Sequence, residues 1–343
     1  MDARRTRSLS IYLIAAFAAV LAGVGYLYIL HRDSLETKPI TSYAEEGEVW
    51  VEEIGMSGGR AAYDRMVRRY AGIPESEAHE YAHVFGAKLF KTEGVGGLGA
   101  CGSAYGWGCY HSHIDRSISS LGLAVLDPLN DVCESLPKAD IQQCQHGLGH
   151  GILSYLGTEK LFDALQYCEN IADPMYGCVS GVFMDLLNGN MHDKRPPLPY
   201  TDSARFWPCT EVGETFKAVC YRRLPQWWWS AVIESSEEPP RTLEQYCRAV
   251  PEKPFQNACF LGVGYFYALK SQLDAEATRI ECAQLEHSTD RQSCMYGAAL
   301  SLFQNAADRA EALCPDNNEL QECIRRAERI LGVSEDSLTF PDE

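Results

Sequence analysis

Positive charge is scarce in this chain of 343 residues. Lysine and arginine together number 30 against 47 aspartates and glutamates, which gives a formal net charge of −17, and the isoelectric point is near 5.0. Nucleic acids and anionic membrane surfaces attract proteins through clustered positive charge. The composition therefore speaks against both as partners, and we expect no nucleic-acid binding.

Three common sequence signals are also absent. The chain has no P-loop, which argues against nucleotide binding of that kind. It has no Cys-x-x-Cys-His, the attachment site of c-type haem. It also has no Asn-x-Ser/Thr acceptor for N-glycosylation, which disfavours a glycosylated eukaryotic surface protein.

Long apolar runs are absent as well, except for one. Residues 11–30 carry no charge, and Arg4, Arg5 and Arg7 precede them. A run of this length predicts a transmembrane signal-anchor helix, and the arginines predict a cytoplasmic N-terminus at residues 1–10. The rest of the chain would then be a periplasmic or extracellular ectodomain on the cell membrane. A cleaved signal peptide is the alternative, although the run ends in bulky rather than small residues.

The composition after this run divides the chain further. Residues 31–58 are rich in glutamate and poor in apolar side chains, which predicts an acidic spacer with a short ordered piece near 49–54. Residues 59–335 contain every cysteine and most of the apolar positions, so they should form the folded domain. Residues 336–343 are expected to be an acidic tail.

Cysteine is absent from the first 100 residues, and fourteen cysteines follow. Successive cysteines alternate between short intervals of 8–12 residues and longer intervals of 20–31 residues. Short and nearly constant intervals favour disulfides between neighbours, which an oxidising compartment outside the cytoplasm permits. The predicted pairs are 101/109, 133/144, 168/178, 209/220, 247/259, 282/294 and 314/323.

The second cysteine of each pair recurs every 29–42 residues, the period of a two-helix repeat. An apolar helix follows each second cysteine, and another helix ends at the next first cysteine. The sequence thus predicts an all-α, disulfide-stapled two-helix repeat solenoid or superhelix behind a single transmembrane helix. Its period resembles that of the tetratricopeptide and Sel1-like repeats, whose consensus motifs are absent. A compact helical domain with scattered disulfides is the alternative. Glycine stands three residues after four of the second cysteines and predicts close helix crossings there: Gly147, Gly181, Gly262 and Gly297.

Residues 79–83 match the HExxH pattern of zincin metalloproteases. On a helix, His79 and His83 lie one turn apart on the same face and can bind one zinc ion, while Glu80 is the expected general base for the metal-bound water. The extended metzincin pattern is not met, because Leu89 stands where its third histidine belongs. A third ligand must therefore come from elsewhere.

Further candidate ligands occur at matching positions of the first two repeats. Two residues after the second cysteine stand His111 and His146, and six residues after it stand Asp115 and His150. Equivalent positions of stacked repeats face the same side, so these groups should line one concave surface with His79 and His83. We therefore predict a metal site formed by His79, His83, His111, His146, His150 and Asp115. The alternative is that these histidines are structural and bond neighbouring helix ends.

Imidazole and carboxylate ligands suit a divalent transition metal, with zinc favoured and iron or copper as alternatives. The corresponding activities are metal-dependent hydrolysis, with Glu80 as base, or redox chemistry. A non-catalytic scaffold that binds a peptide or protein in its concave groove is the alternative of another class.

Trp227, Trp228 and Trp229 form the other conspicuous stretch. Three consecutive tryptophans point in different directions on a helix, so at least one is expected to reach a groove or an interface. Packing within an irregular fourth repeat is the competing interpretation. The proline-rich stretch 195–199 lengthens the preceding repeat and is expected to form a loop over the groove.

Overall fold

The computed structural model of the chain describes residues 17, 39–173, 176–189, 195–314 and 319–339. In this part of the chain all regular structure is helical, as predicted, and no strand forms. A first series of helices packs side by side in chain order: α2 (Tyr43–Ser57), α4 (Glu75–Glu93), α5 (Gly108–Leu121), α7 (Lys138–Leu156), α9 (Gly177–Asn188), α10 (Glu214–Trp228), α12 (Gln256–Lys270), α14 (Ser288–Asn305) and α16 (Leu320–Ile330).

A second series of mostly shorter helices lies between successive members of the first along the chain, except between α4 and α5 and between α9 and α10. Members of this series pack on a neighbouring helix of the first series: α3 (Gly59–Tyr70), α6 (Leu126–Glu134), α8 (Leu161–Asn170), α11 (Pro239–Arg248), α13 (Ala275–Ala283) and α15 (Ala307–Ala310). Short 3₁₀ turns join consecutive helices, such as Gly94–Ala100 between α4 and α5 and Lys253–Phe255 between α11 and α12, and a π-helical turn, Trp229–Ile233, follows α10.

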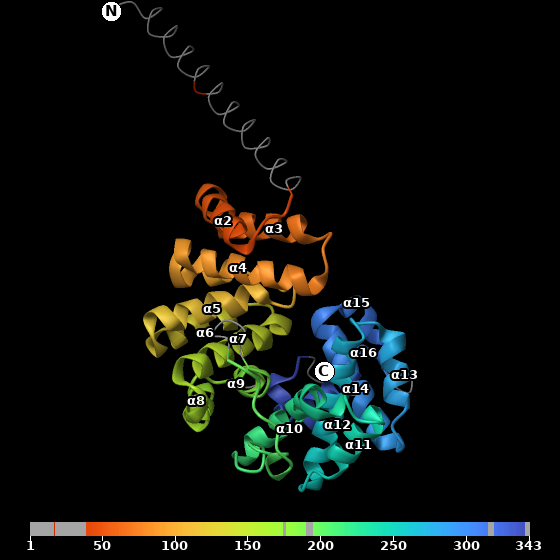
Figure 1. Cartoon of the computed structure of the whole chain (residues 1–343). Helices are drawn as coiled ribbons and strands as arrows, with labels where there is room; N and C mark the ends of the chain where they lie inside the picture. Colours follow the sequence, from red (N-terminus) through yellow and green to blue (C-terminus); the bar gives the residue numbers. More distant parts are fainter. Residues whose placement is uncertain (1–16, 18–38, 174–175, 190–194, 315–318, 340–343) are drawn as a thin grey trace, which may run out of the picture.

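The row of helices curves, so that its end comes back beside its middle. Figure 1 shows α14 and α16 on the arm of the curve that faces α5 and α7, although the helices are far apart in sequence. Two hydrogen bonds join these regions: Gln304 Nε2 donates to Gln142 Oε1 at 2.8 Å, and the Tyr176 hydroxyl donates to the Gly332 carbonyl at 3.3 Å. The concave side of the curve is thus bordered by helices from both halves of the chain.

All seven disulfides join neighbouring cysteines, which confirms the predicted pairing. In four of them the first cysteine lies near the end of a short helix and the second lies in the following long helix. Cys168 of α8 and Cys178 of α9 are an example, with their Cα atoms 5.5 Å apart. Each bridge therefore fixes how the two helices of one unit meet. Disulfides in this number indicate an oxidising compartment.

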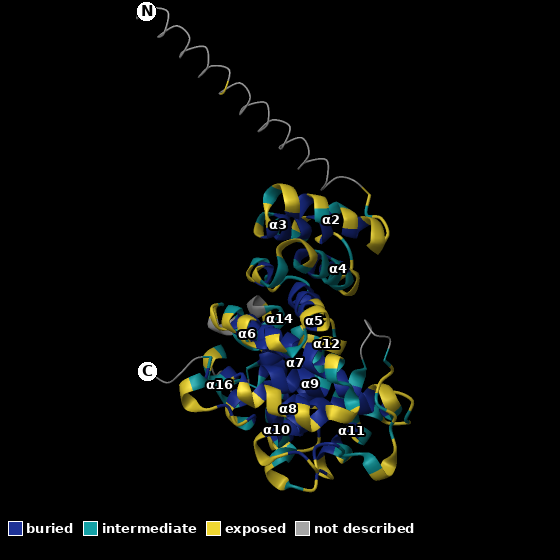
Figure 2. Cartoon of the chain, turned by 90° about the vertical axis from the view of Figure 1, so that its left-hand side faces the viewer, coloured by how far each residue is buried: buried dark blue, intermediate teal, exposed yellow. Residues whose placement is uncertain are grey.

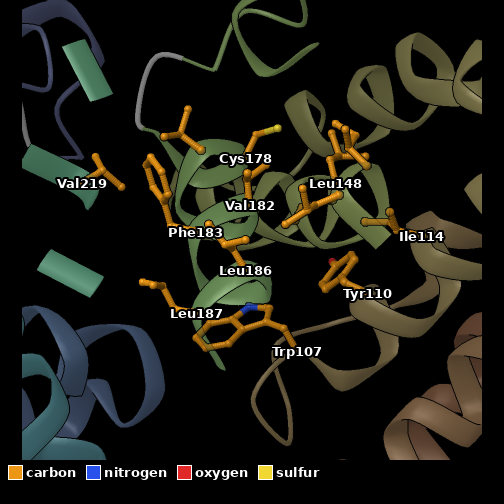
Figure 3. Packing of buried hydrophobic residues seen from close by; sticks show 14 of the residues in the cluster. Trp107, Tyr110, Ile114, Leu148, Cys178, Val182, Phe183, Leu186, Leu187 and Val219 are labelled. Atoms are coloured by element: carbon orange, nitrogen blue, oxygen red, sulfur yellow. The ribbon is translucent and has the colours of Figure 1, made fainter. Parts of the chain in front are cut away.

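The core is continuous along the row of helices. Figure 2 shows buried residues concentrated in α7 and α9, with exposed residues on the outer helices. In Figure 3, Ile114 of α5, Leu148 of α7 and Val182 of α9 belong to one cluster of fully buried side chains. Burial of each such side chain contributes about 1.5–3 kcal/mol.

The predicted glycine crossings are present. A Cβ atom on Gly181 of α9 would lie 2.0 Å from the carbonyl oxygen of His146 in α7, which no side chain could tolerate. The glycines at 262 and 297 meet a backbone carbonyl of the preceding long helix in the same way, and Gly147 meets the Ile114 side chain. Glycine at this position therefore lets successive helices approach to backbone contact.

Residues 43–57 differ from the predicted spacer, because they form α2 and pack on α4. Ser42 and Glu45 cap this helix reciprocally, and Trp50 and Ile54 are buried one turn apart. The acidic composition concealed this, because Glu46 and Glu53 are themselves buried in ion pairs with arginines of α3, Glu46 with Arg69 and Glu53 with Arg65. The opposite charges offset the burial of each carboxylate.

The predicted transmembrane run, residues 11–30, lies outside the described residues except for Phe17. Among the residues that are described, no helix combines the length and apolarity needed to cross a bilayer. At the other end, Leu338 is fully buried and the Thr339 amide donates to the Glu328 carboxylate, so the folded domain continues into the predicted acidic tail.

Candidate metal centre

A cavity of about 300 Å³ opens on the concave side of the helix row. Its wall includes residues from α4, α5, α7, α9, α10, α12 and α14. The side chains six residues after the second cysteine of five successive units all line it: Asp115, His150, Met184, Gln226 and Tyr265. The repeat register therefore determines which side chains face this space, as the sequence predicted for its first two units.

Three imidazoles from two neighbouring helices meet in the wall of this cavity. His79 and His83 lie one turn apart on α4, with ring centroids 4.4 Å apart, and His111 of α5 lies 6.0 and 5.8 Å from them. One nitrogen atom of each ring can be chosen so that all three lie within 4.8 Å of one another. This is a spacing at which three histidines can bind a single ion. Glu80 lines the same cavity.

A tight backbone turn orients the first of these imidazoles. Tyr105, Gly106 and Trp107 all have positive φ angles, of 55°, 57° and 57°. The turn presents the Tyr105 carbonyl oxygen to His79 Nδ1 at 2.8 Å. A carbonyl can only accept, so Nδ1 carries the proton and Nε2 keeps its lone pair. Histidine ligands of metals are commonly held by such a bond.

Close contact between α4 and α5 brings His83 and His111 together. A Cβ atom on Gly86 would lie 2.2 Å from the Cys109 carbonyl oxygen, so only glycine permits this crossing. Gly108 at the start of α5 is equally constrained, because its Cβ would lie 2.8 Å from both the His79 carbonyl oxygen and His83 Cδ2. Gly86, which extends the motif of residues 79–83 to HExxHxxG, thus has a packing role.

The other histidine pair is held differently. The Nε2 atoms of His146 and His150 lie 3.1 Å apart, and His150 Nδ1 lies 3.2 Å from a carboxylate oxygen of Asp185. On the far side, an Arg223 N–H points at His146 Nδ1 at 3.4 Å. Asp185 also pairs with Arg195.

These contacts fix the protons on neutral rings. Arginine can only donate, so His146 Nδ1 accepts and its Nε2 carries the proton. That proton is donated to His150 Nε2, and His150 donates from Nδ1 to the carboxylate. Full burial, together with the neighbouring His150 and Arg223, lowers the pKa of His146 well below its usual value. The pair is therefore a hydrogen-bonded chain, with ring centroids 5.7 and 5.5 Å from His111.

Asp115 is the remaining predicted ligand. It lines the cavity, but it is not part of the group of three imidazoles. His113, on the opposite side of α5, is buried and its Nε2 lies 3.1 Å from the Gly94 carbonyl oxygen. Burial lowers the pKa of His113 to about 4, so it is a neutral structural histidine.

A second group of possible ligands lies away from the cavity, at the surface. Glu244, Glu286 and His287 offer atoms within 4.8 Å of one another, and the last two are exposed. Glu244 already accepts the Glu286 amide at 3.0 Å. Exposed acidic groups of this kind are common without an ion.

Two residues that the sequence reasoning missed are Arg222 and Arg223 of α10. They are 6% and 8% exposed, and both donate to the hydroxyl of Ser180 in α9. Arg223 also lines the cavity. A signal existed for Arg222, because it follows Cys220 by two residues and so shares the register of His111 and His146, with Arg223 next to it. Burial lowers the pKa of both, that of Arg223 to about 9.

The three tryptophans are all buried, at 1%, 0% and 9% exposure for Trp227, Trp228 and Trp229. The segment before α10 covers their outer side, where the Leu198 and Arg205 carbonyls accept from the indoles of Trp227 and Trp228. The packing interpretation therefore holds. Trp227 also borders a second, separate cavity of about 450 Å³.

Two segments match the sequence patterns of other functional motifs but lack the structure that those motifs require. Residues 94–99 read G-x-G-x-x-G, but they lie in the 3₁₀ turn after α4. Residues 55–59 read G-x-S-x-G, but they join α2 to α3. Neither segment follows a strand, which both motifs require, so neither indicates nucleotide binding or a nucleophile elbow.

Comparison with models of protein families, with curated proteins and with solved structures finds no match to this chain. Its function must therefore be argued from the site.

Proposed function

We propose that this protein is a metal-dependent hydrolase of an oxidising compartment, with one divalent ion bound by His79, His83 and His111. The observation that carries the proposal is the meeting of three imidazoles, within 4.8 Å of one another, in the wall of a cavity that Glu80 also lines. Three protein ligands leave a position open for water or substrate, as in catalytic rather than structural zinc sites.

Glu80 is the proposed general base. It follows His79 on α4 and lines the same cavity, so its carboxylate can accept a proton from a water molecule beside the imidazoles. A bound zinc ion would supply Lewis-acid chemistry and lower the pKa of that water. His146, His150 and Asp115 are not proposed as ligands of this ion, because the first two bond each other and Asp115 lies outside the group of three.

Zinc is the proposed ion because imidazole nitrogens in a three-residue set suit it. Iron or copper would suit the same ligands, and either would indicate a redox activity instead. Elemental analysis of the full-length protein, purified without chelators, identifies the metal directly.

The proposal is tested by three single variants of the full-length protein. His111→Ala should lose the bound metal, because two imidazoles remain, while helical content measured by circular dichroism stays unchanged. Glu80→Gln should keep the metal and lose at least about a hundredfold in hydrolysis of a generic ester or peptide substrate. His287→Ala, which changes the surface group, is the matched control and should keep both.

Two results would contradict the proposal. Metal retained by His111→Ala would place the ion elsewhere. A wild-type protein that binds no metal would instead support a scaffold with structural histidines, whose concave groove takes a peptide or protein.

We also propose the setting of this site: a two-helix-repeat superhelix held at the outer face of the cell membrane by residues 11–30. The charge-free run and the preceding arginines support the anchor. Protease added to intact cells should digest the folded domain and spare an N-terminal tag. Recovery of a soluble, N-terminally shortened protein would show instead that the segment is cleaved.

A further inference from the structure

The buried arginines of this protein fall into two kinds. Arg65 and Arg69 of α3 are each paired with a buried glutamate of α2. In the described part of the chain, Arg222 and Arg223 have no carboxylate partner. Both donate to a neutral acceptor, the Ser180 hydroxyl, and Arg223 also points at the neutral His146 Nδ1. Two buried positive charges without a counter-charge are costly, by several kcal/mol for each isolated ion.

Several further contacts show that this pair is incompletely satisfied. Arg222 Nε and Nη1 are buried and have no hydrogen-bond partner among the described residues. Both guanidinium groups lie over the Tyr265 ring, 5.1 and 5.7 Å from its centroid, which offers only a weak attraction for cations. The two arginines also repel each other, which helps to lower the pKa of Arg223. An acidic partner is what the pair lacks.

The cavity gives such a partner access. Arg223 and Tyr265 line it, together with the three imidazoles. Arg223 Nη2 is 3.4 Å from His146 Nδ1, and the His146 ring is 5.7 Å from that of His111. Only the His146 ring therefore lies between the Arg223 guanidinium and His111, a proposed metal ligand. A small group in the cavity can reach both.

We propose that Arg223, supported by Arg222, binds an oxyanion in this cavity, so that the substrate carries a phosphate or carboxylate group beside the bond that is hydrolysed. That the bound anion belongs to a substrate rests on the proposed function, but anion binding itself does not need the metal. Guanidinium groups recognise the paired oxygens of both anions. A cavity of about 300 Å³ accommodates a small ligand or the end of a chain rather than a polymer.

Thermal unfolding of the full-length protein tests this proposal. Chelator-treated, dialysed protein is heated in chloride, in phosphate and in acetate at equal ionic strength. A bound anion stabilises the folded state by mass action, so phosphate or acetate should raise the melting temperature by a few degrees over chloride. A rise with phosphate alone indicates a phosphate group, and a rise with acetate alone a carboxylate.

Arg223→Met and the control Arg205→Met identify the binding group. Arg205 pairs with Asp202 near the surface, so its loss removes the same charge and should leave the anion effect unchanged. Arg223→Met should weaken anion binding at least about tenfold. In chloride, its melting temperature should equal or exceed that of the wild type, because an uncompensated buried charge is gone. A purely structural Arg223 would instead lower it.

The experiment separates this proposal from the metal proposal. His111→Ala should keep the anion effect even though it loses the ion, so a protein without metal can still bind the anion. The proposal is overturned if neither anion exceeds chloride, or if Arg223→Met responds as the wild type does. An effect seen only in metal-loaded protein and kept by Arg223→Met would assign the anion to the ion instead.

Discussion

At the residue scale, the site depends on which ring nitrogen of each histidine holds the proton. The Tyr105 carbonyl fixes Nδ1–H on His79, whereas Arg223 fixes Nε2–H on His146 and Asp185 fixes Nδ1–H on His150. The same residue type therefore does two things in one cavity. His79 offers a lone pair to an ion, whereas His146 and His150 link Arg223 to Asp185 through a chain of hydrogen bonds.

Gly106→Ala tests the orientation of His79. The new Cβ would lie 3.2 Å from His79 Nδ1, and the φ angle of +57° disfavours any side chain. The turn should shift and weaken the bond from His79 to Tyr105, so metal affinity should fall about ten- to a hundredfold. Competition with a chromophoric chelator measures it. Gly72→Ala, which meets no atom within 4 Å, should keep the wild-type affinity. Equal affinities in both variants would show that the turn has no role.

Sequence reasoning found the histidines at this scale but missed the arginines. HExxH and the cysteine register are local patterns, so His79, His83 and His111 could be predicted to share one surface. Arg222 stands in that register too, but arginine is normally exposed, and composition gives no reason to expect it buried. Its partner Ser180 lies 42 residues away. Only the fold brings them together.

At the element scale, close crossings of the long helices position the ligands. Gly86 of α4 touches the Cys109 carbonyl of α5, and this contact sets the distance from His83 to His111. The glycines at four of the crossings could be predicted from the sequence, because each stands three residues after the second cysteine of its repeat. Helix α2 could not be predicted, because its glutamates are typical of a solvent-exposed segment. Their burial becomes understandable only once the fold places Arg65 and Arg69 of α3 beside them.

Gly86→Ala should therefore separate α4 from α5. A methyl group in contact with the Cys109 carbonyl forces the helices apart, and such overpacking costs about 1–3 kcal/mol. We expect a lower melting temperature together with weaker metal binding. Gly55→Ala in α2 is the matched control, because nothing lies within 4 Å of its Cβ position and alanine favours helix. It should be neutral or stabilising by about 0.5–1 kcal/mol. Unchanged metal affinity in Gly86→Ala would refute the link between crossing and site.

At the scale of the whole molecule, the curvature of the helix row closes the cavity. The first half of the chain provides the histidines, and Tyr265 and Asn305 of the second half complete the wall. The sequence placed the histidines of the lining in the first half, but it could not show that polar groups of the second half, such as Arg223 and Asn305, join them or that α14 returns to α7. That closure depends on small angles summed over many helix crossings, and short-range patterns do not encode their total.

The disulfides stabilise this shape without forming the site. Replacing Cys168 and Cys178 together with serine removes a bridge that closes a loop of about ten residues, which should lower stability by about 2–3 kcal/mol on the chain-entropy model. Denaturant unfolding measures the loss. Because neither cysteine contacts the three imidazoles, metal content should stay at the wild-type value. Loss of the metal in a variant that remains folded would mean that this bridge positions the ligands.

The central claim is that one ion is held by imidazoles from α4 and α5. X-ray absorption at the zinc edge, on full-length protein loaded with one equivalent of zinc and dialysed, counts those imidazoles directly. We predict three histidine nitrogens at about 2.0–2.1 Å, with one oxygen ligand completing the tetrahedron. A shell of carboxylate oxygens with one histidine at most, as the surface group at Glu244 would give, or no zinc after dialysis, would contradict the account.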